Sequence, residues 1–140
     1  MILLDTNVIS EPWKPAPNEL VIAWLDAQAL ETLFISAITI AEIRFGIAAM
    51  PLGKRQTILS NRLERDVLPY FSERILPFNL ASSKFYSELM VRARASGKAI
   101  GTSDGYIAAT AAANGLAVAT RDTSPFEAAG LNVINPWTPK

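Results

Sequence analysis

Four acidic residues lie where a carboxylate could take part in catalysis. Asp5 directly follows the apolar run at residues 2–4, and Asp122 follows a second apolar run at residues 116–120. Asp104 lies at the start of a helix predicted for residues 103–113. In parallel α/β sheets, ligands bind beyond the carboxyl ends of the strands, where loops lead into helix N-termini. These three acids therefore fall where a site is expected.

Glu42, the fourth acid, lies in a helix predicted for residues 38–50 that is apolar on nearly every side. At helical spacing Thr39, Glu42, Gly46 and Ala49 form a narrow stripe of small or polar residues. Charged side chains are rarely fully buried without a partner. Glu42 therefore either belongs to a site or is an exposed acid paired with a base such as Arg44.

Each of the other acids also has a simpler interpretation. Asp5 could cap the turn that begins at Thr6, Asp104 could cap its own helix, and Asp122 could stabilise a turn. Capping is compatible with metal binding, because amide donors keep a carboxylate ionised and oriented. Thr6, Asn7 and Thr120 lie beside the acids. They could orient the acids or contact a scissile phosphate, although local capping of the backbone is the simpler role for each.

The 140 residues include no cysteine and no histidine. Disulfides, thiolate nucleophiles and cysteine zinc sites are excluded, and so are Ser-His and Cys-His nucleophilic pairs. If the four acids converge, their mutual repulsion raises some of their pKa values, and a divalent cation removes that difficulty. All-oxygen ligands favour Mg²⁺ or Mn²⁺ over zinc or copper. Such a site can activate water and stabilise charge that develops at phosphorus.

Composition bounds the class of protein further. Half of the residues are apolar and 19% are charged, which is typical of a compact domain and not of a disordered chain. Thirteen basic and thirteen acidic residues give zero net charge, so bulk positive charge is not how this chain would hold nucleic acid. No apolar run approaches the ~20 residues of a membrane span. The N-terminus lacks the basic segment of a signal peptide, and we expect a cytoplasmic protein.

The elements that must position the acids alternate between strands and helices. Strands are predicted at residues 2–4, 33–36, 75–78, 116–120 and 132–134. Helices are predicted at residues 6–10, 19–28, 38–50, 54–71, 82–96, 103–113 and 125–129. This alternation predicts an α/β fold, a three-layer sandwich in which a mainly parallel sheet of about five strands is flanked by helices. We expect one domain over residues 1–140.

Four segments, in this order, resemble the motifs of the PIN domain family, and the resemblance covers essentially the whole chain. They are residues 5–9 (DTNVI), 38–43 (ITIAEI) with Gly46, 104–111 (DGYIAATA) and 119–122 (ATRD). The chain is most similar to the VapC-type toxins of toxin–antitoxin pairs. One departure is Asn79, where relatives often have Asp, and Asn can still cap the helix that follows.

The resemblance implies an endoribonuclease that depends on Mg²⁺ or Mn²⁺ and whose metal is held by Asp5, Glu42, Asp104 and Asp122. It also implies a homodimer and inhibition by a small cognate antitoxin, through which alone the chain would contact operator DNA. RNA contacts are expected from basic side chains near the acids, with Arg121 as one candidate and Lys98 as another.

Two alternatives remain open at this stage. The chain could be a phosphatase that uses Asp5 as a covalent nucleophile, although that family has a second Asp where this chain has Asn7. It could also be a PIN-fold binding module that acts mainly in complex with a DNA-binding partner. Metal-stimulated RNA cleavage by the isolated chain would exclude both.

Overall fold

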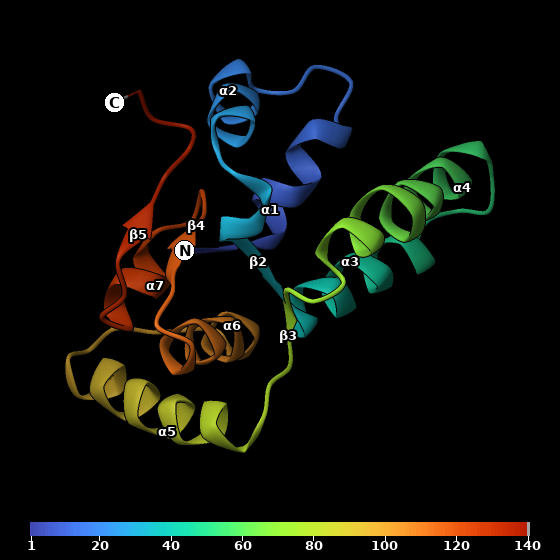
Figure 1. The fold of residues 1–140 in the computed structure, drawn as a ribbon. Coiled ribbons are helices and arrows are strands. Elements are labelled where there is room, and N and C mark those ends of the chain that lie inside the picture. Colours follow the sequence, from blue (N-terminus) through green and yellow to red (C-terminus); the bar gives the residue numbers. More distant parts are fainter. Residues whose placement is uncertain (140) are drawn as a thin grey trace.

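A computed structural model describes residues 1–139 and has a parallel sheet of five short strands at its centre (Figure 1). The strand order is β3-β2-β1-β4-β5, and every neighbouring pair is parallel. The strands are β1 (Ile2–Leu4), β2 (Leu33–Ser36), β3 (Ile75–Leu76), β4 (Ala117–Ala119) and β5 (Val133–Ile134). The predicted three-layer α/β fold with a parallel sheet is confirmed.

Helices connect the strands and cover the sheet. The α-helices are α1 (Thr6–Ser10), α2 (Glu19–Ala27), α3 (Ala37–Ala48), α4 (Lys54–Asn61), α5 (Leu80–Ala95), α6 (Thr102–Ala113) and α7 (Ser124–Ala128). Short helical segments of other types are η1 (Glu11–Trp13), η2 (Leu30–Thr32), η3 (Arg62–Val67) and η4 (Leu68–Phe71). None of the helices in the described part of the chain is long and apolar enough to cross a membrane.

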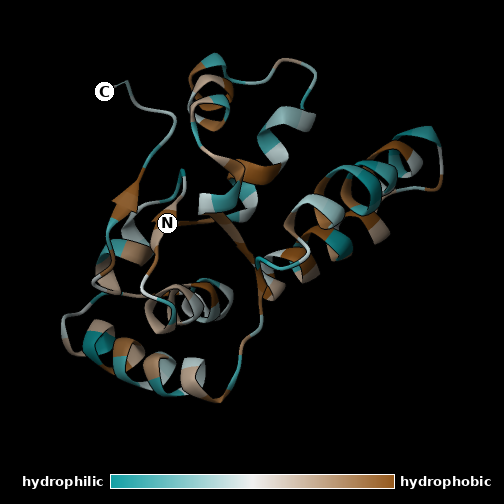
Figure 2. Ribbon diagram, in the orientation of Figure 1, coloured by the Kyte–Doolittle hydropathy of each residue, from teal (hydrophilic) through white to brown (hydrophobic). Residues whose placement is uncertain are grey.

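The core is divided into two apolar clusters, one on each side of the sheet. Leu3 belongs to the cluster formed with α5, α6 and α7, whereas its neighbour Leu4 belongs to the cluster formed with α1, α3 and η3. Successive strand residues point to opposite faces, so a fully apolar strand supplies both clusters. Figure 2 shows the strands mostly in the hydrophobic colours, while the outer helices alternate between hydrophobic and hydrophilic colours.

The sequence predicts a helix over residues 54–71, and the structure is helical throughout this segment, but the helix type changes along it. Regular α-helix ends at Asn61, a π-helical segment follows, and the last turn is a 3-10 helix that begins at Leu68. Pro69 is responsible for part of the change, because proline has no amide hydrogen for the i→i−4 bond. The strand order places β3 at one edge of the sheet.

The strand register brings the carboxyl ends of three strands level with one another. Leu4 pairs with Ile35 of β2 on one side and with Ala119 of β4 on the other. The main-chain N–H of Asp5 extends the second pairing by donating to the Ala119 carbonyl at 3.0 Å. Asp5, Ser36 and Thr120, which follow or end these strands, therefore share one edge of the sheet.

Candidate active site

Asp5 is the most buried of the four predicted acids, with a residue exposure of 6%. It caps α1, and its Oδ1 accepts a hydrogen bond from the main-chain N–H of Thr6 at 2.8 Å. Its Oδ2 accepts a second bond from the hydroxyl of Thr120 at 2.9 Å. Both carboxylate oxygens therefore have a fixed direction, and the predicted capping role of Asp5 is confirmed.

Glu42 reaches the same region from α3. Its Oε1 accepts a hydrogen bond from the hydroxyl of Thr6 at 2.9 Å, across a separation of 36 residues. Arg44, the alternative partner considered from the sequence, instead pairs with Glu64 at 3.0 Å. Thr6 thus connects two of the acids, since its amide binds Asp5 and its hydroxyl binds Glu42.

Thr120 is fully buried and organises the opposite side of the site. Its hydroxyl donates to Asp5 and accepts from the main-chain N–H of Asp122 at 3.1 Å and from the Asn7 amide at 3.4 Å. The Oδ1 of Asn7 in turn accepts from the main-chain N–H of Arg121 at 3.3 Å. Thr6, Asn7 and Thr120 therefore hold the acids in position, one of the two roles predicted for them.

Asp104 lies in the first turn of α6, but it does not cap that helix. Gly101 occupies the N-cap position without a side-chain bond, and Asp104 is the third helical residue. The capping interpretation of Asp104 is therefore wrong. Its neighbour Gly105 is buried where α5 and α6 pack together, and a Cβ there would lie 3.0 Å from the Met90 sulfur and from a Tyr86 ring carbon. This close approach fixes the start of α6, and with it Asp104.

The charges of the four acids act on one another. The pKa of Asp5 is raised to about 6, mainly by burial and to a smaller extent by the charges of Asp104 and Glu42, against the opposing hydrogen bonds from Thr120 and Thr6. The pKa of Asp104 is also raised, first by burial and then by the charges of Asp122 and Glu42. Asp5, Glu42, Asp104 and Asp122 thus form one electrostatic cluster, which we call the acid centre.

No basic side chain balances the acid centre within residues 1–139. The ion pairs found there join Glu11 to Lys14 and Glu64 to Arg44, and neither includes one of the four acids. A group of carboxylates with only oxygen donors and no ion-pair partner, in which the pKa values of Asp5 and Asp104 are raised, suits a hard divalent cation.

Within residues 1–139, no three carboxylates lie close enough together to hold one ion. Mg²⁺ usually keeps several waters and binds one or two carboxylates directly, so the donor set fits that ion without a closed cage. The four acids are the residues that would hold such an ion.

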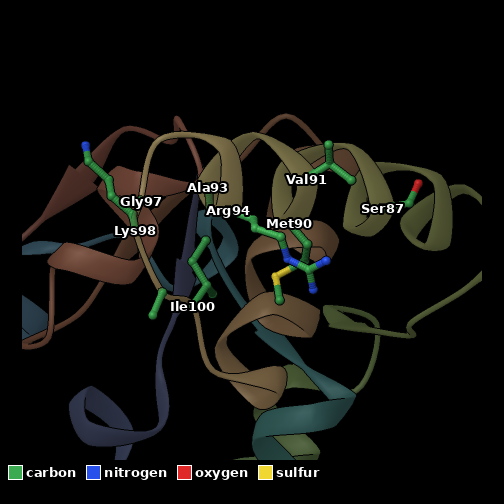
Figure 3. Close-up of a pocket in the computed structure, with 9 residues that line it drawn as sticks. Ser87, Met90, Val91, Ala93, Arg94, Gly97, Lys98 and Ile100 are labelled. Carbon is green, nitrogen blue, oxygen red and sulfur yellow. The ribbon is translucent and has the colours of Figure 1, made fainter.

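A hollow of about 520 Å³ elsewhere on the molecule is the obvious alternative site (Figure 3). It lies over α5 and the loop to α6, and Arg94, Lys98 and Ile100 are among its lining residues. None of the four acids lines it, and it contains no carboxylate at all. Lys98, considered from the sequence as an RNA contact, lies here. Chemistry is assigned to the acid centre, because metal binding and acid–base chemistry need the carboxylates that the hollow lacks.

Two features of the site region were not predicted from the sequence. The guanidinium of Arg121 lies over the ring of Trp137, with 5.6 Å between its carbon and the ring centroid. Glu11 is only 3% exposed and forms an ion pair with Lys14 at 2.9 Å. The i, i+3 spacing of Glu11 and Lys14 was a visible signal for that pair, whereas nothing local connects Arg121 with Trp137.

Comparison with known proteins finds similar sequences that cover almost the whole chain. The family model described as PIN domain matches residues 2–131. The chain is 66% identical to the VapC ribonuclease Y4jK of Sinorhizobium fredii, with 99% of each chain covered. It is 53% identical to Toxin FitB of Neisseria gonorrhoeae, with 98% of this chain and 99% of the other covered.

Solved structures agree in fold. The crystal structure of FitAcB from Neisseria gonorrhoeae has a TM-score of 0.95 at 53% identity and covers 98% of this chain and 99% of its own. The structure of FitAB bound to an IR36 DNA fragment has a TM-score of 0.97 at 51% identity, with coverages of 100% and 98%. These alignments span β1 to β5 and therefore include all four acids.

Proposed function

The chain belongs to the PIN domain family, as its match to the family model and its identity to VapC and FitB proteins show, and from this premise we propose that it is the toxin of a type II toxin–antitoxin pair. We propose further that it is an endoribonuclease that depends on Mg²⁺ or Mn²⁺. The observation that supports the proposal best is the acid centre: four carboxylates from α1, α3, α6 and the end of β4, with no basic partner among residues 1–139.

A divalent cation bound by the acid centre would lower the pKa of a coordinated water and offset the negative charge that develops on the phosphate oxygens. The role of the protein is to orient the carboxylates and to provide their negative charge. Asp5 is held at both carboxylate oxygens by Thr6 and Thr120. Thr6 holds Glu42 through its hydroxyl, so the spacing between these two acids depends on one short side chain.

Asp122 is the exposed member of the acid centre, and the exposed Arg121 precedes it in the chain. Asp122 is exposed, and its main chain is anchored to the buried Thr120 hydroxyl. A phosphodiester would approach from this side, because Asp5 and Thr120 are closed off from solvent. Arg121 is exposed next to Asp122 and could meet the RNA phosphates that lie beside the cut bond.

The proposed partners follow from the relatives. FitAB is a complex bound to DNA in its solved structure, and we propose that this chain is likewise inhibited by a small cognate antitoxin that provides the contact with operator DNA. A homodimer in the cytoplasm is proposed as well. Large exposed apolar side chains support the dimer, among them Phe45 at 75%, Val91 at 67% and Leu52 at 94% exposure.

The test is RNA cleavage by the antitoxin-free chain with Mg²⁺ and with EDTA. We expect cleavage that EDTA abolishes, and we expect Asp104→Asn to lower kcat by at least 100-fold while the chain stays folded. Glu88→Gln, which changes an exposed acid of α5, is the matched control and should cleave like the wild type. Cleavage by the Asp104→Asn chain at the wild-type rate would contradict the proposal.

A further inference from the structure

Arg121 lies over the Trp137 ring beside the acid centre, and two further cations, Lys14 and Arg55, lie at η1. We call Lys14, Arg55, Arg121 and Trp137 the Trp137 patch. All three cations are exposed, and the tryptophan is partly buried. Arg121 connects the patch to the acid centre, because it lies between Thr120 and Asp122 in the chain.

The Arg121 main chain is fixed while its guanidinium is turned toward the tryptophan. Its main-chain N–H donates to Asn7 Oδ1 at 3.3 Å, so the residue is tied to the hydrogen bonds of the acid centre. Its guanidinium carbon lies 5.6 Å from the Trp137 ring centroid, which is within the range of a cation–π contact. The side chain therefore stays close to the acids without neutralising them.

Trp137 is held by the path of the chain after β5. The main-chain N–H of Thr120 donates to the Ile134 carbonyl at 2.9 Å, so this segment leaves the sheet beside the residue that binds Asp5. The main-chain N–H of Trp137 then donates to Asn135 Oδ1 at 2.9 Å. One face of the tryptophan packs against the apolar cluster of β1 and α1. The ring is thus a fixed platform and not a loose side chain.

Lys14 and Arg55 extend the positive charge along η1. Lys14 pairs with Glu11 at 2.9 Å, and the other oxygen of Glu11 accepts from the Asn18 N–H at 2.9 Å. Glu11 is 3% exposed, so its negative charge is covered while half of the Lys14 side chain stays accessible. Arg55 donates to the Trp13 carbonyl at 3.2 Å. The hydrogen bonds from Lys14 and Asn18 lower the pKa of Glu11, and the charges of Lys14 and Arg121 lower it to a smaller extent.

A strand of RNA that approaches four carboxylates needs positive charge nearby, and the chain as a whole has none in excess. The patch supplies three cations against one covered carboxylate, next to the exposed acid Asp122. Single-stranded RNA is recognised by bases that stack on aromatic rings or on guanidinium planes, and the Arg121–Trp137 pair offers both surfaces.

We infer that the Trp137 patch is an RNA subsite, which binds single-stranded nucleotides flanking the cut phosphodiester. One base stacks on the Arg121–Trp137 pair, and the adjoining phosphates lie against Lys14 and Arg55. The inference rests on the proposed ribonuclease function and adds the place and the form of the substrate. A basic peptide of an antitoxin would be repelled here, so the patch fits RNA better than such a peptide.

The test measures binding of a fluorescein-labelled oligouridylate to the full chain in EDTA, over a series of salt concentrations. EDTA prevents metal-dependent cleavage, so binding is measured apart from catalysis. We expect Trp137→Leu to weaken binding by roughly 5- to 150-fold, the loss of one base–aromatic stack, and Trp137→Phe to restore most of it. Arg121→Gln should reduce the slope of log K against log salt by about 0.7, the value for one phosphate contact with a single strand.

Matched controls keep the outcome unambiguous. Arg65→Gln changes an exposed arginine of η3, and Trp24→Leu changes a partly buried tryptophan of α2. Both should bind like the wild type, and all variants should keep the wild-type melting temperature within a few degrees. In Mg²⁺, the patch variants should raise KM and leave kcat within about threefold.

Two results would overturn the inference. If the wild type cleaves RNA in Mg²⁺ while Arg121→Gln and Trp137→Leu bind oligouridylate as it does, the subsite is wrong and the ribonuclease proposal stands. The subsite is also wrong, and the ribonuclease proposal stands, if these variants lose affinity for the antitoxin but not for oligouridylate. If the wild type neither binds nor cleaves RNA, both proposals fail together.

Discussion

Replacing Asp5 by asparagine should make the metal-free chain more stable at neutral pH. The carboxyl is buried and its pKa is raised to about 6 from an ordinary 3.8. This difference corresponds to about 3 kcal/mol of preference for the neutral form in the folded state. Asparagine is neutral at every pH and has nearly the same shape, so it removes that penalty.

The sign of the pH dependence follows from proton binding. Between about pH 4 and pH 6 the folded chain holds a proton on Asp5 that the unfolded chain has released. The free energy of unfolding therefore decreases as pH rises through this window. Above about pH 7 the penalty is complete, and below about pH 4 it disappears. The advantage of Asp5→Asn should appear and disappear over the same window.

The hydrogen bonds at Asp5 can be kept in the variant. The side-chain oxygen of asparagine can still accept from the Thr6 amide, which now binds Asp5 at 2.8 Å. Its NH₂ group can donate to the Thr120 hydroxyl, provided that this hydroxyl turns its own hydrogen elsewhere. The Asp122 carbonyl, 3.5 Å from the hydroxyl oxygen, is an available acceptor. The reorganisation reduces the gain, so about 3 kcal/mol is an upper value.

The assay is urea and thermal unfolding followed by circular dichroism at pH 4 and pH 7.5 in EDTA. A gain of 2–3 kcal/mol in a chain of 140 residues corresponds to a melting temperature higher by roughly 10 °C at pH 7.5. Little difference is expected at pH 4. A variant that is less stable than the wild type at pH 7.5, or equally shifted at both pH values, would refute the electrostatic reasoning.

Four further measurements test other parts of the structure. Mg²⁺ or Mn²⁺ at 100 times its Kd should stabilise the wild type by about 2.7 kcal/mol, and Asp104→Asn much less, in a thermal shift assay. Gly105→Ala should cost about 1–3 kcal/mol in urea unfolding, because its Cβ would lie 3.0 Å from Met90 and Tyr86. Thr39→Val should be neutral or stabilising by about 1 kcal/mol, because the buried Thr39 hydroxyl has no partner among residues 1–139. Thr110→Val should cost about 1 kcal/mol, since that hydroxyl donates to the Tyr106 carbonyl at 2.8 Å.

The sequence was sufficient to predict the sheet and the edge where the acids gather. Apolar runs that end at Leu4, Ser36 and Ala119 are strands, and a parallel arrangement puts their carboxyl ends together. The position of Asp5 beside Thr120 then follows from the register, although 115 residues separate them. Patterns of apolar residues report this level of structure, because burial of whole strands depends on them.

Side-chain partners across elements could not be predicted in the same way. The bond from Thr6 to Glu42 depends on how α1 packs against α3, and the contact of Arg121 with Trp137 depends on the path of the chain after β5. Arg44 illustrates the limit: it is two residues from Glu42 but binds Glu64, because successive helical residues face different directions. Local spacing identified which residues carry charge, and tertiary packing decided which charges meet.

The acid centre also explains why stability and cation binding should be linked in this chain. Three of the acids are positioned by separate hydrogen bonds: Asp5 caps α1, Glu42 accepts from the Thr6 hydroxyl, and the main-chain N–H of Asp122 donates to the Thr120 hydroxyl. These hydrogen bonds supply no positive charge, so the repulsion between the acids remains in the folded state. The negative charge of Asp5, which is disfavoured mainly by burial and to a smaller extent by the charges of Asp104 and Glu42, sets the neutral-pH penalty and would also attract a divalent cation. A substitution that removes the neutral-pH penalty at Asp5 should therefore weaken cation binding in proportion. A chain that gains stability but keeps its affinity for Mn²⁺ would show that the penalty and the affinity have different origins.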